Sequence, residues 1–325
     1  MRRIIEATEK DRKAVFATAA AQLRIPVEMV EKDFWVCWTL KKLFDDRELS
    51  KKLRFKGGTS LSKVFHLIHR FSEDIDLILD WCCVTDDDPL AKRSGSKQDA
   101  FNKSIQKMAG GYIGDTFCRK VAAALEPECR VDPDPRDPHV LLIGYPEAFP
   151  KSYITPNVRL EIGPLAAWIP NERFPIRSYV AEAFPSLEMQ PFSIPTILAE
   201  RTFWEKATIL HQEHHRPEEI PAPLRYSRHY YDLFMMGKSD FLRKALERKE
   251  LLKAVVDFKR KFYPRAWARY DMAVPGTLRL LPAEHSLKLL RDDYKAMRTM
   301  IFGDYPAWDD ICVFLTELEQ KINHC

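Results

Sequence analysis

Carboxylate and hydroxyl side chains, both of which can do chemistry, lie close together in residues 54–80, RFKGGTSLSKVFHLIHRFSEDIDLILD. Asp74 and Asp76 are two positions apart in a run whose apolar residues alternate with them, as in a β-strand. Side chains of a strand alternate between its two faces, so both carboxylates point the same way. Two carboxylates on one face can share a hard divalent cation. The run therefore predicts a Mg²⁺ site.

A glycine pair, Gly57-Gly58, precedes this run and is followed by Thr59 and Ser60. Glycine has no Cβ, so a phosphate can approach its backbone, and the N-terminus of a following helix offers unpaired N–H groups to an anion. Thr59 and Ser60 either cap that helix or bind phosphate oxygens. The order strand, glycine turn, helix, strand predicts a phosphate site next to the metal.

A third carboxylate is offered by NVRLEIG at residues 157–163, where Arg159 and Glu161 alternate with apolar residues. On a neighbouring strand, Glu161 could join Asp74 and Asp76 in a site for one or two Mg²⁺ ions. The competing interpretation is an ordinary turn with a solvated acidic face, which explains each part alone but not the parts in this order. Walker A and Rossmann fingerprints are both excluded, because GGTSLSK lacks their glycine spacing.

Composition favours a cytoplasmic protein with a large core and no membrane contact. The 325 residues are 46% hydrophobic, and 51 basic against 47 acidic side chains give a net charge of +4, too small to indicate a nucleic-acid partner. No apolar stretch approaches the length of a membrane span, and the charged start does not resemble a signal peptide. The seven cysteines form no CxxC pair, so we expect free thiols.

The apolar periodicity divides the chain into an α/β domain at 1–190 and an α-helical C-terminal domain at 191–325. Extended runs predict a mixed sheet of about five strands: KLRF, DIDLILD, CRVD, HVLLIGY and NVRLEIG. Helical spacing predicts helices at 11–24, 28–44, 60–69 and 97–126. From residue 193 onward the pattern is almost wholly helical.

The stretch FKGGTSLSK, followed by RFSEDIDL, resembles the AbiEii-like nucleotidyltransferases, toxins of bacterial toxin–antitoxin and phage-defence systems. Three further stretches are similar to parts of that family: EKDFWVCWTLKKLF (31–44), RTFWEKATILH (201–211) and RHYYDLFMM (228–236). The resemblance spans about residues 28–236 and implies a polymerase-β-like nucleotidyltransferase domain.

The resemblance also implies roles for single residues of the glycine turn. Gly58 and Ser60 hold the triphosphate of an NTP, with Gly57 and Thr59 in the same turn. The family's glycine-serine element stands here as Gly57-Gly58-Thr59-Ser60, so either Thr59 or Ser60 takes the part of the serine.

The metal and the remaining nucleotide contacts are implied in the same way. Asp74 and Asp76 bind Mg²⁺ or Mn²⁺, Lys206 contacts a phosphate as a point charge, and Asp232 orders the site. Each assignment has a plainer alternative: a lone lysine on a helix is usually solvated, and Asp232 lies four residues after Arg228, at ion-pair spacing.

Two other spacings on the predicted helix from residue 194 have alternative interpretations. Arg201 lies four residues before Glu205, so it either pairs with that glutamate or makes a secondary nucleotide contact. His211 and His215 have the spacing of two zinc ligands, but the glutamate between them is at the wrong offset for HExxH. This favours histidines at a solvated helix end over a metal site.

The acceptor implied by the resemblance is RNA, most specifically the 3′ end of tRNA, whose blocking halts translation. A cognate antitoxin is the implied protein partner. Basic side chains on the early helices either meet RNA phosphates or only solubilise the surface: Lys41, Lys42, Lys51, Lys52 and Arg54. Two rivals stay open, namely transfer to a protein or small-molecule hydroxyl, and a non-catalytic nucleotide-binding partner protein. The preferred NTP is not readable from the sequence.

Overall fold

The computed structural model describes residues 1–149, 157–187 and 189–324. Their packing forms two compact units, the first made of Met1–Val64 with Ser72–Ile197 and the second of Phe65–Phe71 with Leu198–Cys325. The sequence places a boundary near residue 190, whereas the packing changes after residue 197, because the strand at Phe192–Ile197 still belongs to the sheet of the first unit. The extent of independently folding domains stays a prediction.

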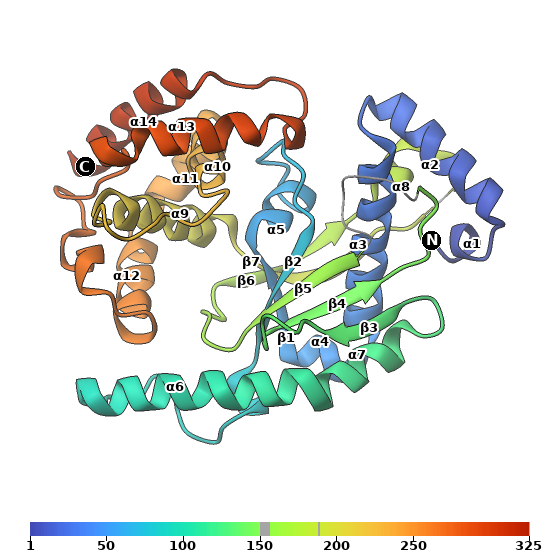
Figure 1. The fold of residues 1–325 in the computed structure, drawn as a ribbon, viewed down its shortest axis with the longest axis horizontal. Coiled ribbons are helices and arrows are strands. Elements are labelled where there is room, and N and C mark those ends of the chain that lie inside the picture. Colours follow the sequence, from blue (N-terminus) through green and yellow to red (C-terminus); the bar gives the residue numbers. More distant parts are fainter. Residues whose placement is uncertain (150–156, 188, 325) are drawn as a thin grey trace. The chain divides into compact units, whose positions relative to one another are not determined.

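A seven-stranded mixed sheet in the order β3-β4-β5-β2-β1-β7-β6 is the centre of the first unit (Figure 1). β2 is parallel to β5 and β1 is parallel to β7, while the other neighbours are antiparallel. The strands are β1 (Leu53–Lys56), β2 (Asp74–Leu79), β3 (Arg130–Pro133), β4 (Val140–Gly144), β5 (Asn157–Gly163), β6 (Asn171–Ile176) and β7 (Phe192–Ile197).

The α/β class and the five predicted strands are confirmed, but the described sheet contains two strands more. β7 carries the sequence FSIPTI, which runs directly into a helix and was therefore included in the helical pattern. Its β-branched residues suit a buried strand, and Pro195 interrupts helical hydrogen bonding. β6, with the sequence NERFPI, begins with three polar residues, contains a proline and lies at the edge of the sheet, where one side needs no partner.

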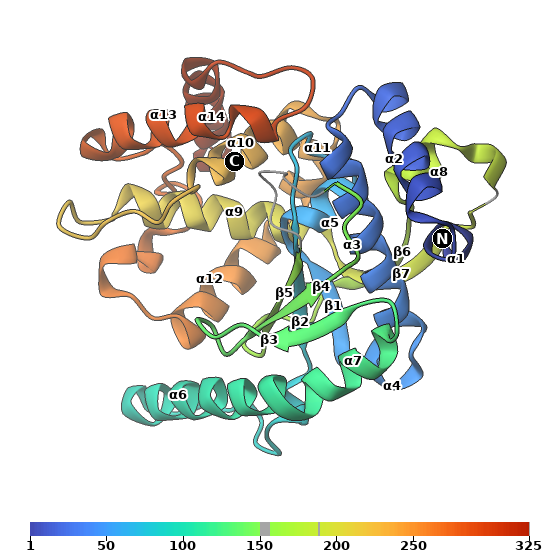
Figure 2. The same cartoon turned by 45° about the vertical axis from the view of Figure 1, so that its right-hand side comes forward.

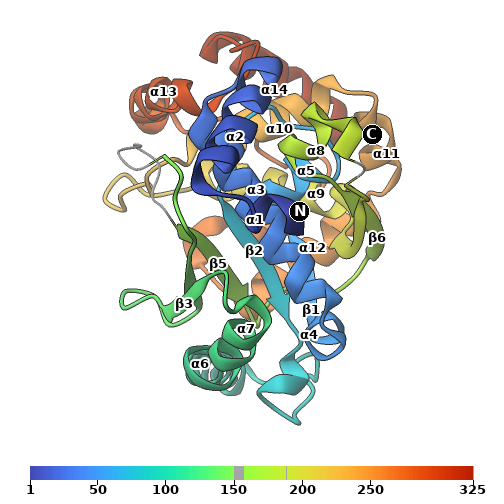
Figure 3. The same ribbon diagram turned by 90° about the vertical axis from the view of Figure 1, so that its right-hand side faces the viewer.

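Helices cover the sheet because one face of it is apolar. α3 packs on β5 and α7 packs on β3 (Figure 3), and Ile75, Leu77 and Leu160 are buried in the same core as Trp35 of α3. The helices of this unit are α1 (Arg2–Ile5), α2 (Glu9–Leu23), α3 (Val27–Asp45), α4 (Arg47–Lys52), α5 (Gly57–Lys63), α6 (Gly95–Tyr112), α7 (Cys118–Leu125) and α8 (Tyr179–Ala183). A π-helical turn, Ile113–Phe117, joins α6 to α7.

The helix expected at 60–69 is shorter and begins earlier. α5 starts at Gly57 and ends at Lys63, and His66 has a left-handed backbone with φ of 52°. Residues 65–71 belong to the second unit, where Arg70 forms a β-bridge with Ile301 and the Phe71 N–H donates to Met300 O at 2.7 Å. This extended pairing replaces the helical hydrogen bonds that the apolar spacing predicted.

The second unit is helical, as predicted. α9 packs against α10, α11 and α12 (Figure 2), and its Trp204 indole donates to Ala245 O at 3.1 Å. Its helices are α9 (Ala199–His214), α10 (Ser227–Lys238), α11 (Phe241–Glu247), α12 (Glu250–Phe262), α13 (Leu287–Ala296) and α14 (Trp308–Asn323). Within the described ranges, no helix combines the length and apolarity that spanning a membrane requires. The six cysteines before Cys325 are free thiols, and Cys325 lies outside the described residues.

Candidate metal and nucleotide site

The pairing of β2 with β5 gathers three carboxylates on one face of the sheet. Asp74 stands opposite Arg159 and Asp76 opposite Glu161 in the parallel register. Between the two aspartates, Ile75 is fully buried on the other face. Paired positions on adjacent strands point to the same side, so the predicted common face of Asp74, Asp76 and Glu161 is confirmed. Their binding of a metal stays a prediction.

The Asp74 carboxylate is partly buried and, among the described residues, only partly hydrogen-bonded, which suits a metal ligand. Its Oδ1 atom is buried, and no hydrogen bond from the described residues reaches it. Burial raises the pKa of the Asp74 carboxyl, and the neighbouring Glu73 and Asp76 raise it further. A bound divalent cation would satisfy this oxygen and offset the repulsion, so the Asp74–Asp76 pair fits Mg²⁺.

Arg159 stands between the carboxylates and partly neutralises them. Its Nε lies 3.8 Å from Asp74 Oδ1 and 3.7 Å from Glu161 Oε1, and its Nη1 bonds Asp134 Oδ2 at 2.7 Å. Within the described chain, no three acidic, histidine or cysteine side chains are grouped closely enough to hold a metal together. Glu161 as a third ligand therefore stays a prediction that requires Arg159 to move aside.

Gly57 is the residue of the glycine turn that the geometry explains most directly. Its φ is 82°, and a Cβ built on it would lie 1.9 Å from Asp76 Oδ2. Only glycine permits both the left-handed backbone and this close approach. The turn's backbone therefore lies directly against the carboxylate of Asp76, at the carboxyl end of β1.

The two hydroxyl residues of the turn are buried and hydrogen-bonded within the first unit. Ser60 Oγ donates to Gly57 O at 2.8 Å. Thr59 Oγ1 lies 2.9 Å from Ser72 Oγ and donates to the carbonyl oxygen of Asp74. The Thr59 bonds fasten α5 to the start of β2, whereas the Ser60 bond lies within α5. Phosphate binding by either hydroxyl stays a prediction, and it requires that hydroxyl to give up its present acceptor.

A buried charged triplet in α3 also fixes this region, and the sequence analysis assigned it no role. Lys32 Nζ lies 2.6 Å from Glu73 Oε2, immediately before Asp74, and Lys32 is 1% exposed. Asp33 bonds Lys63 Nζ at 2.8 Å, at the end of α5. Three consecutive charges, flanked by Met29-Val30 and by Phe34-Trp35-Val36, are the signal that could have revealed these roles.

Glu31, the first member of this triplet, holds a loop. Its carboxylate accepts the backbone N–H groups of Ala148 at 2.5 Å and Phe149 at 3.3 Å. Burial raises the pKa of Glu31, although these two hydrogen bonds oppose that rise. The triplet thus connects three separate segments to α3.

The candidate residues of the second unit form a buried ionic cluster. Asp232 is fully buried and accepts Arg70 Nε at 2.7 Å, Arg70 Nη2 at 2.9 Å and Lys206 Nζ at 2.6 Å. Burial alone would raise the pKa of Asp232, but Arg70 and Lys206 lower it overall. Within the described residues, Asp232 therefore pairs with Arg70 and Lys206 and not with Arg228, the cation at ion-pair spacing on its own helix. Arg70 is a member of the cluster that sequence reasoning missed.

Lys206 and Arg201 have different surroundings on α9. Lys206 is 5% exposed, and desolvation lowers the pKa of its ammonium. His229 Nδ1 lies 3.5 Å from its Nζ. Arg201 Nε pairs with Glu205 Oε1 at 3.1 Å, which is the plainer of its two interpretations. Nucleotide contacts by both side chains stay predictions.

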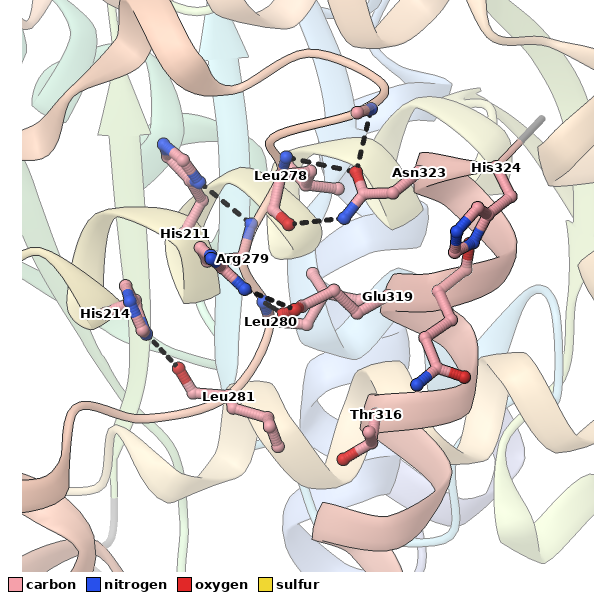
Figure 4. Close-up of polar contacts among 12 residues, drawn as sticks. His211, His214, Leu278, Arg279, Leu280, Leu281, Thr316, Glu319, Asn323 and His324 are labelled. Carbon is pink, nitrogen blue, oxygen red and sulfur yellow. Dashed lines mark hydrogen bonds and ion pairs between the residues drawn. The ribbon is translucent and has the colours of Figure 1, made fainter.

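The histidines at the end of α9 serve the packing of the second unit (Figure 4). His211 is fully buried; its Nδ1 accepts the Arg279 N–H at 3.0 Å and its Nε2 lies 2.9 Å from Arg269 O. Both ring nitrogens of His211 have hydrogen-bond partners within the protein. The side chain is therefore neither placed as a metal ligand nor solvated at a helix end. The expectation of solvated histidines was wrong for His211 because the chain beyond α12 folds back over it.

Comparisons with known proteins identify relatives. The family model described as "Nucleotidyl transferase AbiEii toxin, Type IV TA system" matches residues 38–313. Among solved structures, JHP933 from Helicobacter pylori is 13% identical with a TM-score of 0.45, over 92% of this chain and 94% of that chain. The nucleotidyltransferase toxin MenT4 from Mycobacterium tuberculosis is 16% identical with a TM-score of 0.44, over 95% and 97%. Comparison with curated proteins gives no match.

Proposed function

Because the chain belongs to the AbiEii nucleotidyl transferase toxin family, we propose that it transfers a nucleoside monophosphate from an NTP to a hydroxyl group of RNA. The acceptor oxygen forms a bond to the α-phosphorus, the bond to pyrophosphate breaks, and the acceptor hydroxyl loses its proton. The proposed acceptor is the 3′ end of tRNA, where an added nucleotide would halt translation. A cognate antitoxin is the proposed protein partner, since the family description names a toxin–antitoxin system.

The carboxylate face of β2 is the observation that supports this function most directly. Asp74 and Asp76 share that face, and Asp74 Oδ1 is buried without a hydrogen bond in the described chain. We assign Asp74 and Asp76 as the residues that bind the metal ion. Mg²⁺ or Mn²⁺ bound there supplies positive charge for the α-phosphate and the leaving pyrophosphate.

The glycine turn and two cations complete the proposed assignment. Gly57 brings the backbone against Asp76, so the turn and its neighbour Gly58 are assigned to the triphosphate. Lys206 is assigned to the negative charge of the departing pyrophosphate, and Asp232 orients its ammonium, which has three N–H donors. Arg201 is assigned a secondary nucleotide contact.

An acceptor assay tests the proposal. The purified protein is incubated with Mg²⁺, each of the four NTPs labelled at the α-phosphate, and either total tRNA, a protein extract or small hydroxyl compounds. Asp74→Asn and Asp76→Asn proteins are the controls. We expect label in tRNA with the unmutated protein only. Label in the protein or small-molecule fraction would show that the acceptor is not RNA. The absence of label from every fraction would contradict nucleotidyl transfer.

A further inference from the structure

The segment FKRKFYPRAWARY, residues 258–270 of the second unit, is unusually basic and aromatic. It contains five basic and five aromatic side chains and no acidic one. It covers the end of α12 and two short 3₁₀ turns, Ala266–Ala268 and Tyr270–Met272. Basic side chains interleaved with aromatic ones are the composition of surfaces that bind nucleic acid.

Apolar side chains anchor this segment and leave its arginines outside. Phe262 and Tyr270 are 4% and 5% exposed, and the Tyr270 hydroxyl donates to Gln212 Oε1 of α9 at 2.7 Å. Arg260 and Arg265 are exposed. The guanidinium groups therefore project from a backbone that is fixed to the helical core.

One buried imidazole joins this segment to a loop that carries a further arginine, Arg279. The Arg279 N–H donates to His211 Nδ1, so His211 Nε2 carries the proton and donates to Arg269 O. The side chains of Arg269 and Arg279 are 51% and 53% exposed. His211 thus holds two arginine-bearing backbones next to each other.

The loop that carries Arg279 is held from the other side by α14 (Figure 4). Glu319 accepts the Leu280 N–H at 2.6 Å and Arg279 Nη1 at 3.1 Å. Asn323 accepts the N–H of Leu278 at 3.1 Å and donates to its carbonyl oxygen at 2.9 Å. Preorganised cations lose less conformational entropy when they bind a ligand than mobile ones do.

Four exposed arginines define what we call the arginine surface: Arg260, Arg265, Arg269 and Arg279. Two carboxylates accompany them, Asp271 at 3.5 Å from Arg269 Nε and Glu319 at 3.1 Å from Arg279 Nη1. Two positive charges therefore remain after pairing.

The early helices are basic too, so net charge alone does not separate them from the arginine surface. Residues 41–54 carry six basic and three acidic side chains. Lys41 bonds Asp45 at 2.5 Å and Lys52 bonds Glu48 at 2.9 Å, while the Arg54 guanidinium lies 4.1 Å from the ring centre of Trp168. Pairing weakens what these cations offer a phosphate backbone, as it does for Arg269 and Arg279. The arginine surface differs in consisting of guanidinium groups interleaved with aromatic side chains.

We propose that the arginine surface binds the phosphate backbone of the RNA acceptor. The inference rests on the proposed function, which supplies a polynucleotide as the acceptor. Guanidinium groups bind phosphate oxygens in a bidentate manner. Tyr263, which is 41% exposed, adds a ring on which an unpaired base can stack.

Salt-dependent RNA binding tests the proposal in the full chain. The dissociation constant for total tRNA is measured by filter binding at several salt concentrations. The first variant combines Arg260→Gln, Arg265→Gln and Arg279→Gln, and the matched control combines Lys41→Gln, Lys51→Gln and Lys52→Gln. We expect the arginine variant to bind at least about tenfold more weakly at 0.1 M salt, with a salt slope reduced by about 2 to 3, since each phosphate contact contributes about 0.7 to 0.9.

Equal tRNA affinity of the arginine variant and the unmutated protein would overturn the proposal, as would a larger loss in the lysine control. A polyglutamate competitor as effective as tRNA would also overturn it and indicate an acidic protein partner. Thermal stabilisation of each variant by Mg²⁺ and NTP verifies that the protein is folded and binds nucleotide. If the unmutated protein transfers label but shows no tRNA binding, only the proposal that the arginine surface binds RNA is overturned. If it transfers no label, the proposed function is overturned.

Discussion

At the scale of single residues, the contact between Gly57 and Asp76 explains why a glycine turn and an acidic strand occur together. The sequence predicted that glycine lets a phosphate approach, whereas the structure gives Gly57 a nearer neighbour, the Asp76 carboxylate. A pattern of residue types cannot reveal such a contact, because it depends on the antiparallel register that places Lys56 opposite Asp76. The common face of Asp74 and Asp76, which depends only on strand alternation, was predictable.

We predict that Gly57→Ala destabilises the protein and impairs transfer. The alanine Cβ would collide with Asp76 Oδ2, and the left-handed backbone adds roughly 1–2 kcal/mol of strain. Gly111→Ala in α6 is the matched control, because a Cβ there meets nothing within 4 Å and alanine favours a helix by about 0.5–1 kcal/mol. Urea unfolding and label transfer measure both effects; a Gly57→Ala protein equal to its control would refute the close contact.

Because the pKa of Asp74 is raised in the folded protein, we predict that ionised Asp74 lowers the stability of the fold, by an amount that depends on pH. Burial raises the folded-state pKa above the unfolded value, so folding favours the protonated carboxyl, and stability is lost as pH rises through the folded pKa. Asp74→Asn should therefore raise the melting temperature at pH 7 in the absence of metal, and the gain should shrink at acidic pH. Asp304→Asn, at an exposed position, should show no such gain. A lower melting temperature of Asp74→Asn at pH 7 would contradict this prediction.

At the scale of elements, most strands and helices follow from periodicity, and the failures have local causes. The five predicted strands exist, but β7 was hidden because its apolar residues continue into α9 without an intervening turn. The helix predicted at 60–69 ends at Lys63, since residues 65–71 hydrogen-bond to residues 300–302 instead. A partner more than 200 residues away leaves no trace in a local pattern.

The Arg70–Asp232–Lys206 cluster predicts a large effect of one isosteric substitution. Asp232→Asn would leave two buried cations without their counterion, and breaking a buried pair in this way costs roughly 3–5 kcal/mol. Asp240→Asn, at the exposed start of α11, where the side chain makes no capping hydrogen bond, should change stability by less than about 0.5 kcal/mol. Urea unfolding of both variants measures the difference, and equal stabilities would show that Asp232 does not hold the cluster.

At the scale of the whole molecule, the chain has an α/β unit and a helical unit, and the candidate residues are divided between them. The carboxylates and the glycine turn belong to the first unit, and Lys206, Asp232 and Arg70 to the second. Sequence motifs identified the carboxylates, the lysine and Asp232, because each lies in a compact stretch. They did not identify Arg70, which reaches Asp232 only through folding, or Arg279, which lies beside the segment 258–270 only because both contact His211.

The transfer rate of Asp76→Asn protein, measured with the labelled NTP and acceptor that the unmutated protein uses, tests the central claim most directly. Loss of this carboxylate removes the proposed metal ligand without adding bulk next to Gly57. The account predicts a fall in rate of about 10³-fold or more, as expected when electrostatic stabilisation of a developing charge is removed, with an unchanged fold by circular dichroism. A folded Asp76→Asn protein that transfers label at close to the normal rate would contradict metal-dependent nucleotidyl transfer at this site.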